Sequence, residues 1–200
     1  MGRNSISHVR KPEILEHVYA VLKVEGILNT SLAKIANHMG VNSSLLIHYF
    51  KTKDNMMAEL VDSLAERYAN YFEGNRKALM DVQDPTIRLD TLLDLLFDPD
   101  WESVVDASVF WGCFYLGYRN EKIKERFKKM YEGFMKAIAK EIRERRKREN
   151  LDIVDSGKAA IAIIALIDGY AFYNSAVDRE HPNPEELKYL KGVAKKILGI

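Results

Sequence analysis

Residues 30–54 read TSLAKIANHMGVNSSLLIHYFKTKD, and this stretch predicts two short helices joined by a tight turn. Ile35 and Ala36 lie on one face of the first helix, where the small side chain of Ala36 suits a close helix crossing. Gly40 permits the backbone reversal between the helices because it has no Cβ. Asn42 can then cap the second helix. The pattern predicts a helix-turn-helix, whose second helix enters the major groove of DNA.

The polar side chains at the ends of these two helices are the candidates for DNA contact. The first residues of a recognition helix meet base edges, and its flanks meet phosphates. We expect Ser43, Ser44 and Leu45 to face the bases. The expected DNA-binding residues are Thr30, Ser31, Asn42, Ser43, Ser44, Leu45, His48, Tyr49, Lys51 and Lys53.

Charge is distributed unevenly along the chain. Residues 1–53 hold seven basic and three acidic side chains, a net charge of +4, although the whole chain of 200 residues carries only +1. A basic N-terminal quarter on a nearly neutral chain favours a module that contacts nucleic acid. The opposing interpretation is a chance fluctuation in composition.

Helical signals continue on both sides of this stretch, and no segment has the pattern of a strand. The sequence predicts an all-α fold of about nine helices, with a three-helix unit at 1–53 and a helical bundle at 54–200. The predicted helices begin or end near Pro12, Gly26, Asp84-Pro85, Asp98-Pro99, Trp101, Tyr118, Glu121, Arg148, Asp155 or Ser156, Ala176 and Glu185. The helix that starts near Thr52 is expected to belong to both parts.

Residues 30–54 resemble the signature of the TetR family, which in typical members reads roughly TTVRDIAxxAGVSxGxLYxH/YFxSKE. The matching residues are Thr30, Ser31, Leu32, Ile35, Ala36, Gly40, Val41, Leu46, Tyr49, Phe50, Lys53 and Asp54. The resemblance extends over residues 10–60. It implies a DNA-binding domain at 1–53, a ligand-binding and dimerisation domain at 54–200, and repression of transcription from a palindromic operator that a small molecule relieves.

Several positions depart from the family signature. Ala33 stands where Arg is frequent, Ile47 where Tyr is common, and Ser43 and Ser44 where Lys and Gly are frequent. The operator of a relative therefore cannot be carried over to this chain. The segments LLIHYFKTKDNMM and IALIDGYAFY are similar to those of BetI-type repressors, which sense choline.

Aromatic residues are frequent in the second half of the chain, where they form either a packed core or a ligand pocket. An aromatic cage beside a carboxylate suits a cationic amine, which makes such an amine the candidate effector. The candidate pocket residues are Trp101, Asp106, Phe110, Trp111, Phe114, Tyr115, Tyr118, Asp168, Tyr170 and Tyr173. Asp168 lies within an apolar helix, so it pairs locally, faces a dimer partner or contacts the ligand.

A single recognition helix reads few base pairs, so a homodimer on two half-sites is expected. The resemblance implies that the helices at 156–178 and 184–198 pair with those of a second copy. Small residues such as Ala165 and Gly169 would allow close approach, although core packing explains the same pattern. The charged run at 140–148 is expected to be the solvated end of a long helix, with a second nucleic-acid contact as the alternative.

The sequence argues against an enzyme. None of the five histidines pairs with another His or with Cys113 at the helical spacing of metal ligands, so neither metal nor cofactor is expected. A lone cysteine and the absence of a secretion signal indicate the cytoplasm, and the apolar run at 159–173 is short for a membrane span. Two alternatives stay open: a transcriptional activator of the same fold, and a helical interaction protein without DNA binding.

Overall fold

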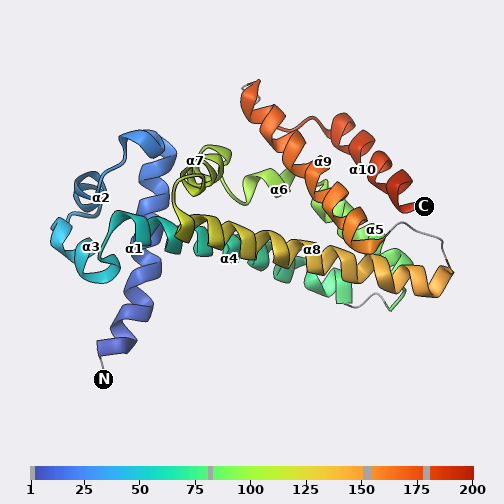
Figure 1. Cartoon of the computed structure of the whole chain (residues 1–200), viewed down its shortest axis with the longest axis horizontal. Coiled ribbons are helices and arrows are strands. Elements are labelled where there is room, and N and C mark those ends of the chain that lie inside the picture. The colour runs from blue at the N-terminus through green and yellow to red at the C-terminus, as the bar shows by residue number, and fades with distance from the viewer. Residues whose placement is uncertain (1–2, 81–82, 151–154, 178–180) are drawn as a thin grey trace. The chain divides into compact units, whose positions relative to one another are not determined.

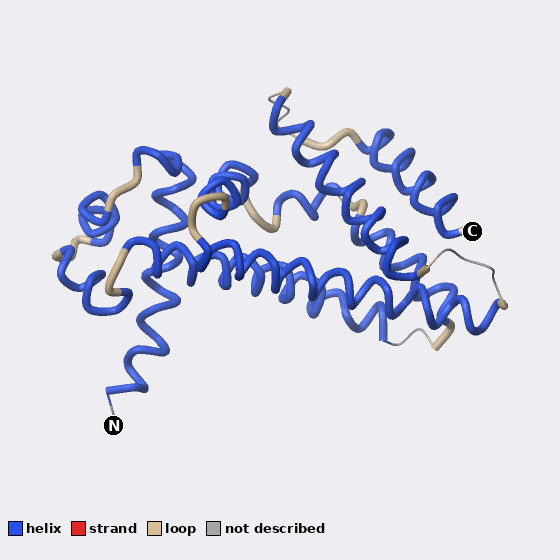
Figure 2. Tube along the Cα trace, in the orientation of Figure 1, coloured by secondary structure: helices blue, strands red, loops and turns tan. Residues whose placement is uncertain are grey.

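The computed structural model describes residues 3–80, 83–150, 155–177 and 181–200, and every regular element in them is a helix (Figures 1 and 2). Ten helices are described where the sequence predicts about nine, and the all-α prediction is confirmed. The helices are α1 (Arg3–Asn29), α2 (Leu32–Met39), α3 (Ser43–Phe50), α4 (Lys53–Met80), α5 (Pro85–Leu96), α6 (Pro99–Ser103), α7 (Ala107–Gly117), α8 (Glu121–Glu149), α9 (Ser156–Ala176) and α10 (Pro184–Leu198).

Local signals explain the boundaries of α2 and α3. The hydroxyl of Ser31 accepts a hydrogen bond from the backbone N–H of Lys34 at 3.2 Å, which caps α2. Gly40 ends α2 with φ 66°, a left-handed conformation that favours glycine. The Asn42 side chain accepts from the backbone N–H of Ser44 at 2.9 Å and caps α3. The turn chemistry predicted from the sequence is therefore confirmed.

Two boundaries differ from the prediction. α1 begins at Arg3 and contains Pro12, whereas the sequence suggested that Pro12 starts the helix. The predicted helix at 101–118 is divided into α6 and α7. α6 begins before Trp101 because Asp98 caps it and Pro99 is its first residue, a combination that starts a helix. The interruption lies between Ser103 and Ala107, where α6 ends and α7 begins.

The chain forms two compact units by packing, and the predicted region 54–200 contributes residues to both. Unit 1 comprises residues 1–68 and 108–130, and unit 2 comprises residues 69–107 and 131–200. The long helices α4 and α8 each contribute residues to both units. A boundary at the start of α4 therefore sets the helix-turn-helix apart, but the two packing units do not divide at that residue.

In unit 1, α2 and α3 pack on each other and on α1 (Figure 1). The side chains that hold these helices together alternate at helical spacing and are excluded from solvent. They include Ile14, Val18 and Leu22 of α1, Ile35 of α2, Leu46 of α3, and Met56 and Leu60 of α4. The same core fixes which face of α3 remains outside.

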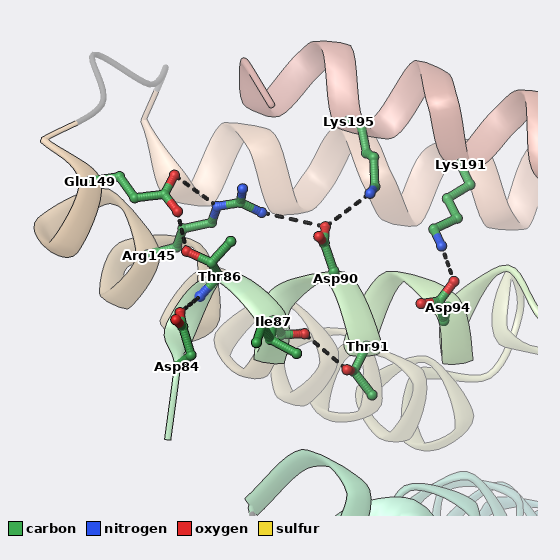
Figure 3. Close-up of polar contacts among 10 residues, drawn as sticks. All are labelled: Asp84, Thr86, Ile87, Asp90, Thr91, Asp94, Arg145, Glu149, Lys191 and Lys195. Carbon is green, nitrogen blue, oxygen red and sulfur yellow. Dashed lines mark hydrogen bonds and ion pairs between the residues drawn. The ribbon is translucent and has the colours of Figure 1, made fainter. Parts of the chain in front are cut away.

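In unit 2, α9 packs against α10, and ion pairs connect α5 to α8 and α10 (Figure 3). The Arg145 side chain is only 8% exposed, and it contacts carboxylate oxygens of Asp90 at 3.4 Å and Glu149 at 3.2 Å. Lys195 reaches Asp90 at 3.1 Å, and Lys191 pairs with Asp94. The expectation of a merely solvated charged run at 140–148 is wrong for Arg145, because this side chain is buried and pairs with Asp90 of α5.

Candidate DNA interface and effector site

One face of α3 is buried and the other is open. Leu46 and Phe50 are at most 2% exposed and hold α3 in the core of unit 1. On the other side Ser44, Ile47 and His48 are exposed. An amphipathic helix held in this way presents a row of side chains that a groove of DNA can accept.

The start of α3 has the properties of an anion site. Its first backbone N–H groups have no partner within the helix, and they carry the positive end of the helix dipole. Asn42 and Ser44 are exposed there, and Ser43 and Leu45 are half-buried. Four of the predicted residues are therefore together at one helix end, where a phosphate or a base edge could approach.

Two predicted residues connect α4 to the end of α1. Thr30 is only 3% exposed, and its hydroxyl donates to the carbonyl of Gly26 at 2.7 Å. The ammonium of Lys53 donates to the carbonyl of Thr30 at 2.5 Å. Thr30 is therefore a structural residue rather than a DNA contact, because burial and an internal partner occupy its side chain. Lys53 is half-buried and keeps two further N–H donors.

The remaining predicted DNA residues surround α3. Ser31 is exposed at the start of α2, and Lys51 is exposed immediately after α3, with its ammonium 3.1 Å from the His48 carbonyl. Tyr49 is half-buried, and its ring lies edge-on to that of His48 with centroids 5.2 Å apart. These side chains supply hydroxyl, imidazole and ammonium donors, the types that contact phosphates.

The ten residues predicted to form a ligand pocket are divided between the two units. Trp101 is in unit 2, where its ring contacts those of Tyr71, Phe72 and Phe134 at centroid distances of 5.8, 5.2 and 6.2 Å. Phe134 in turn contacts Tyr131 at 6.3 Å. We call Tyr71, Phe72, Trp101, Tyr131 and Phe134 the unit 2 aromatic cluster.

Asp168 belongs to the same unit. Its carboxylate accepts a hydrogen bond from Tyr131, which joins it to the unit 2 aromatic cluster. Burial raises the pKa of Asp168, and the hydrogen bond from Tyr131 opposes that change. The pKa of Tyr71 is also raised, by burial and by the negative charges of Asp98 and Asp100. The cluster therefore combines aromatic faces with negative potential, which favours a cation.

Five other predicted pocket residues, Phe110, Trp111, Phe114, Tyr115 and Tyr118, are in unit 1. Phe110 and Phe114 pack edge-on against Phe127 at 5.5 and 5.3 Å. Tyr115 and Tyr118 are 59% and 76% exposed. Phe110 and Phe114 therefore pack in the core of unit 1, and Tyr115 and Tyr118 lie on its surface.

The last three predicted residues, Tyr170, Tyr173 and Asp106, are in unit 2, but their described contacts are not with the unit 2 aromatic cluster. Tyr170 is buried, its hydroxyl donates to Glu186 at 3.1 Å and accepts from the backbone N–H of Asn183 at 2.9 Å, and it thereby joins α9 to α10. Tyr173 is 48% exposed on α9. Asp106 is half-buried between α6 and α7. Of the ten, only Trp101 and Asp168 lie at the unit 2 aromatic cluster by the contacts described.

Comparisons with known proteins agree with this architecture. Residues 14–60 match the family model described as "Bacterial regulatory proteins, tetR family", and residues 85–200 match "Tetracyclin repressor-like, C-terminal domain". The second match alone covers more than half of the chain. The chain belongs to the TetR family.

This TetR-family chain is 24% identical over 195 residues to the HTH-type transcriptional regulator BetI of Yersinia pestis (strain Pestoides F), covering 93% of this chain and 90% of that protein. Its fold is similar to a TetR transcription regulator from Haloarcula marismortui, with a TM-score of 0.78 at 22% identity and coverage of 96% and 97%. It is also similar to a Saccharomonospora viridis transcriptional regulator solved in complex with choline, with a TM-score of 0.73 at 19% identity and 96% coverage of both chains. The protein is thus a TetR-family transcriptional regulator with a DNA-binding helix-turn-helix domain.

In the TetR-family chain, a polar connection also reaches the recognition helix from α8. The ammonium of Lys122 donates to the side-chain oxygen of Asn55 at 2.7 Å, and the amide nitrogen of Asn55 donates to the carbonyl of Phe50 at 3.0 Å. Beside it, α4 and α8 border a hollow of about 440 Å³ lined mostly by charged side chains of both signs. Nothing in the sequence pattern around Asn55 signals this connection, because Lys122 is 67 positions away in the chain.

The sequence also missed Tyr71 and Phe72 as possible ligand contacts of this TetR-family chain, because they follow the regular apolar pattern of a long helix. Cys113, in contrast, needs no functional explanation. It is fully buried in unit 1, and burial raises the pKa of its thiol to about 12, so it is a core residue and no thiolate nucleophile.

Proposed function

We propose that this regulator is a homodimeric repressor, that it binds a palindromic operator in the cytoplasm, and that a cationic amine releases it. The observation that carries the proposal is α3, which is anchored by Leu46 and Phe50 and exposes Ser44, Ile47 and His48. Ser43, Ser44 and Leu45 would approach base edges. Phosphate contacts would come from Ser31, Asn42, His48, Tyr49, Lys51 and Lys53.

The proposed dimer interface is the exposed apolar face of α9 together with α10. Ile161 and Phe172 are 56% and 59% exposed, and Ala165 and Gly169 lie exposed between them at helical spacing. Among the described residues α9 is the one helix long and apolar enough to cross a membrane, but 33% of that stretch is buried in the chain. A second copy covering this face would remove its apolar surface from water. The predicted range 156–178 extends to residue 178, which lies outside the described residues.

The proposed effector site is the unit 2 aromatic cluster with Asp168. A quaternary or protonated amine would be attracted by the ring of Trp101 through cation–π interaction and by the Asp168 carboxylate. Such a ligand would also offset the burial that raises the pKa of Asp168. The similarity to BetI, and to the regulator solved with choline, makes choline the first compound to test.

The proposed release mechanism uses the helices that contribute to both units. A ligand at the cluster contacts residues of α4 and α8, and the start of each helix connects to α3 through Asn55 and Lys122. A change in the tilt of either helix would change the distance between the two recognition helices of a dimer. Release follows because the ligand favours the state that no longer fits the operator.

Fluorescence anisotropy on the DNA upstream of the protein's own gene, over a salt series, tests the DNA proposal. We expect selective binding that Lys53→Ala and Tyr49→Ala weaken, with the salt slope falling by about one for the lysine variant. Lys124→Ala and Tyr118→Ala remove exposed residues of the same types elsewhere and should bind like wild type. Binding no stronger than to random DNA would favour the helical interaction protein, and transcription raised by the bound protein would favour an activator.

Choline added to the DNA complex tests the effector proposal. We expect release in wild type and in Asp106→Asn, and no release in Asp168→Asn. Loss of the response in Asp106→Asn alone would move the site to the other carboxylate that the sequence singled out. Sedimentation of Phe172→Arg, with Ile87→Arg as a control at an exposed position of α5, tests the dimer interface.

A further inference from the structure

Two histidines from different helices face each other in unit 1. The Nδ1 atoms of His17 on α1 and His38 on α2 are 3.2 Å apart, with ring centroids at 5.2 Å and ring planes at 67°. His17 is half-buried and His38 is exposed. The residues are 21 positions apart, so the contact exists only because α1 packs on α2. Neither histidine is a residue to which the DNA or effector proposals assign a role.

The Nδ1 atoms of two neutral imidazoles can lie this close together in two ways. One ring can donate its Nδ1–H to the other, or both can direct Nδ1 lone pairs at one metal ion. Zinc binds imidazole nitrogen at about 2.0–2.1 Å, so two nitrogens on one tetrahedral zinc lie about 3.3–3.4 Å apart. The observed 3.2 Å is close to this separation. The χ2 torsion of histidine is soft, so a small ring rotation suffices to converge the lone pairs.

We propose that His17 and His38 form a binding site for a divalent transition-metal ion of the class that imidazole prefers, namely Zn²⁺, Ni²⁺ or Cu²⁺. Among the described residues no group of three or more His, Cys, Asp or Glu side chains is arranged to hold a metal. The site therefore supplies two protein ligands, and water completes the coordination shell. Mg²⁺ and Ca²⁺ are excluded from this class because they require oxygen ligands.

Occupancy of the site would fasten α2 to α1. α2 is the first helix of the helix-turn-helix, and α1 is the helix that both α2 and α3 pack against. A metal that binds the folded domain and not the unfolded chain stabilises it by mass action. With metal at about 100 times its dissociation constant, a protein of this size should gain about 5 °C or more in Tm.

The test is thermal unfolding of the full-length protein in metal-free buffer at pH 7.5, with NiCl2, ZnCl2 or MgCl2 added. We expect NiCl2 and ZnCl2 to raise Tm and MgCl2 to leave it unchanged, with one Ni²⁺ bound per chain by calorimetry. His38→Gln and His17→Asn, which keep a hydrogen-bonding side chain but remove the imidazole, should abolish the shift. His181→Ala removes an exposed histidine outside the site and should keep it.

Two outcomes would overturn the proposal. No rise in Tm with 1 mM NiCl2 would mean that the pair is only a hydrogen bond, and an equal rise in His38→Gln would place the metal elsewhere. His38 is exposed, so the His38→Gln variant should fold even if His17→Asn does not. Anisotropy on operator DNA without metal separates this result from the regulator proposal, because His38→Gln should bind DNA like wild type there.

Discussion

Each unit contains a cluster of aromatic rings, and the two clusters differ in their polar partners. In unit 1, Phe110 and Phe114 each contact Phe127 edge-on, and we call these three residues the unit 1 cluster; Phe110 and Phe127 are 8% and 4% exposed. In unit 2, the rings around Trp101 lead through Tyr131 to the carboxylate of Asp168. Aromatic content therefore cannot distinguish a core from a ligand site.

The half-buried carboxylate of Asp168 makes this distinction. A carboxylate without a cation costs free energy when it is buried, and packing alone gives no reason to keep one. In unit 1, Cys113 is fully buried, and burial raises the pKa of its thiol to about 12, so it supplies no negative charge there. We propose that the unit 1 cluster contributes stability and that the unit 2 cluster recognises the ligand, and each role can be tested by substitution.

The largest expected effect is on stability in unit 1. Phe110→Ala should lower the free energy of unfolding by about 3–5 kcal/mol, because it leaves a cavity beside Phe127 and Tyr68. Urea unfolding measures the change. The Phe110→Ala protein that remains folded should still respond to choline. Phe134→Ala is the matched variant: this ring is half-buried, so it should cost less stability but weaken the choline response. The reverse pattern would exchange the two assignments.

A smaller effect is expected on ligand affinity in unit 2. Asp168→Asn keeps the shape of the side chain but removes the charge that pairs with the amine. We expect choline affinity to fall by about 1.5–3 kcal/mol, or tenfold to more than a hundredfold, by calorimetry. Affinity for operator DNA should not change. An unchanged choline affinity would mean that Asp168 is a structural residue of α9.

The sequence was most informative where structure depends on near neighbours. Gly40 and Asn42 act within a few residues of their own positions, and their roles in the turn and as the cap of the second helix were predicted correctly. The helix-turn-helix follows from such signals, which is why its place in the chain could be read directly.

The contacts of the proposed effector site could be read from the sequence only in part. Trp101 and Asp168 were singled out, but Tyr71 and Phe72 were not, since they come from a helix whose start belongs to the DNA-binding motif. Five other candidates are in unit 1 because α7 packs there. The histidine pair shows the same limit, because a search at helical spacing cannot find ligands that two packed helices bring together.

A third prediction concerns the link between the rings and the carboxylate. Tyr131→Phe removes the hydroxyl that donates to Asp168. We expect the free energy of unfolding at pH 7 to fall by about 0.5–1.5 kcal/mol, the usual net value of one hydrogen bond. Tyr118→Phe, at a position 76% exposed in unit 1, should have no such effect. Equal stability of Tyr131→Phe and wild type would remove Tyr131 from the proposed site.

The smallest expected effect is a difference in pH dependence. Burial raises the pKa of Asp168 above its ordinary value of 3.8, so the folded protein holds this proton more tightly than the unfolded chain. As pH rises from that value through the folded pKa, the contribution of Asp168 to stability falls, because the charged form is disfavoured only in the folded state. Asp84, Glu149 and Asp155 have lowered pKa values and act in the opposite direction.

The test is therefore the difference in unfolding free energy between wild type and Asp168→Asn across this pH range, because the contributions of the other carboxylates cancel in that difference. Wild type should lose stability relative to the variant as pH rises, and choline should reduce that loss, since a cation at the carboxylate lowers its pKa again. A difference that does not vary with pH would mean that Asp168 is as well solvated in the folded protein as in the unfolded chain, and the unit 2 aromatic cluster would then be core like its counterpart in unit 1.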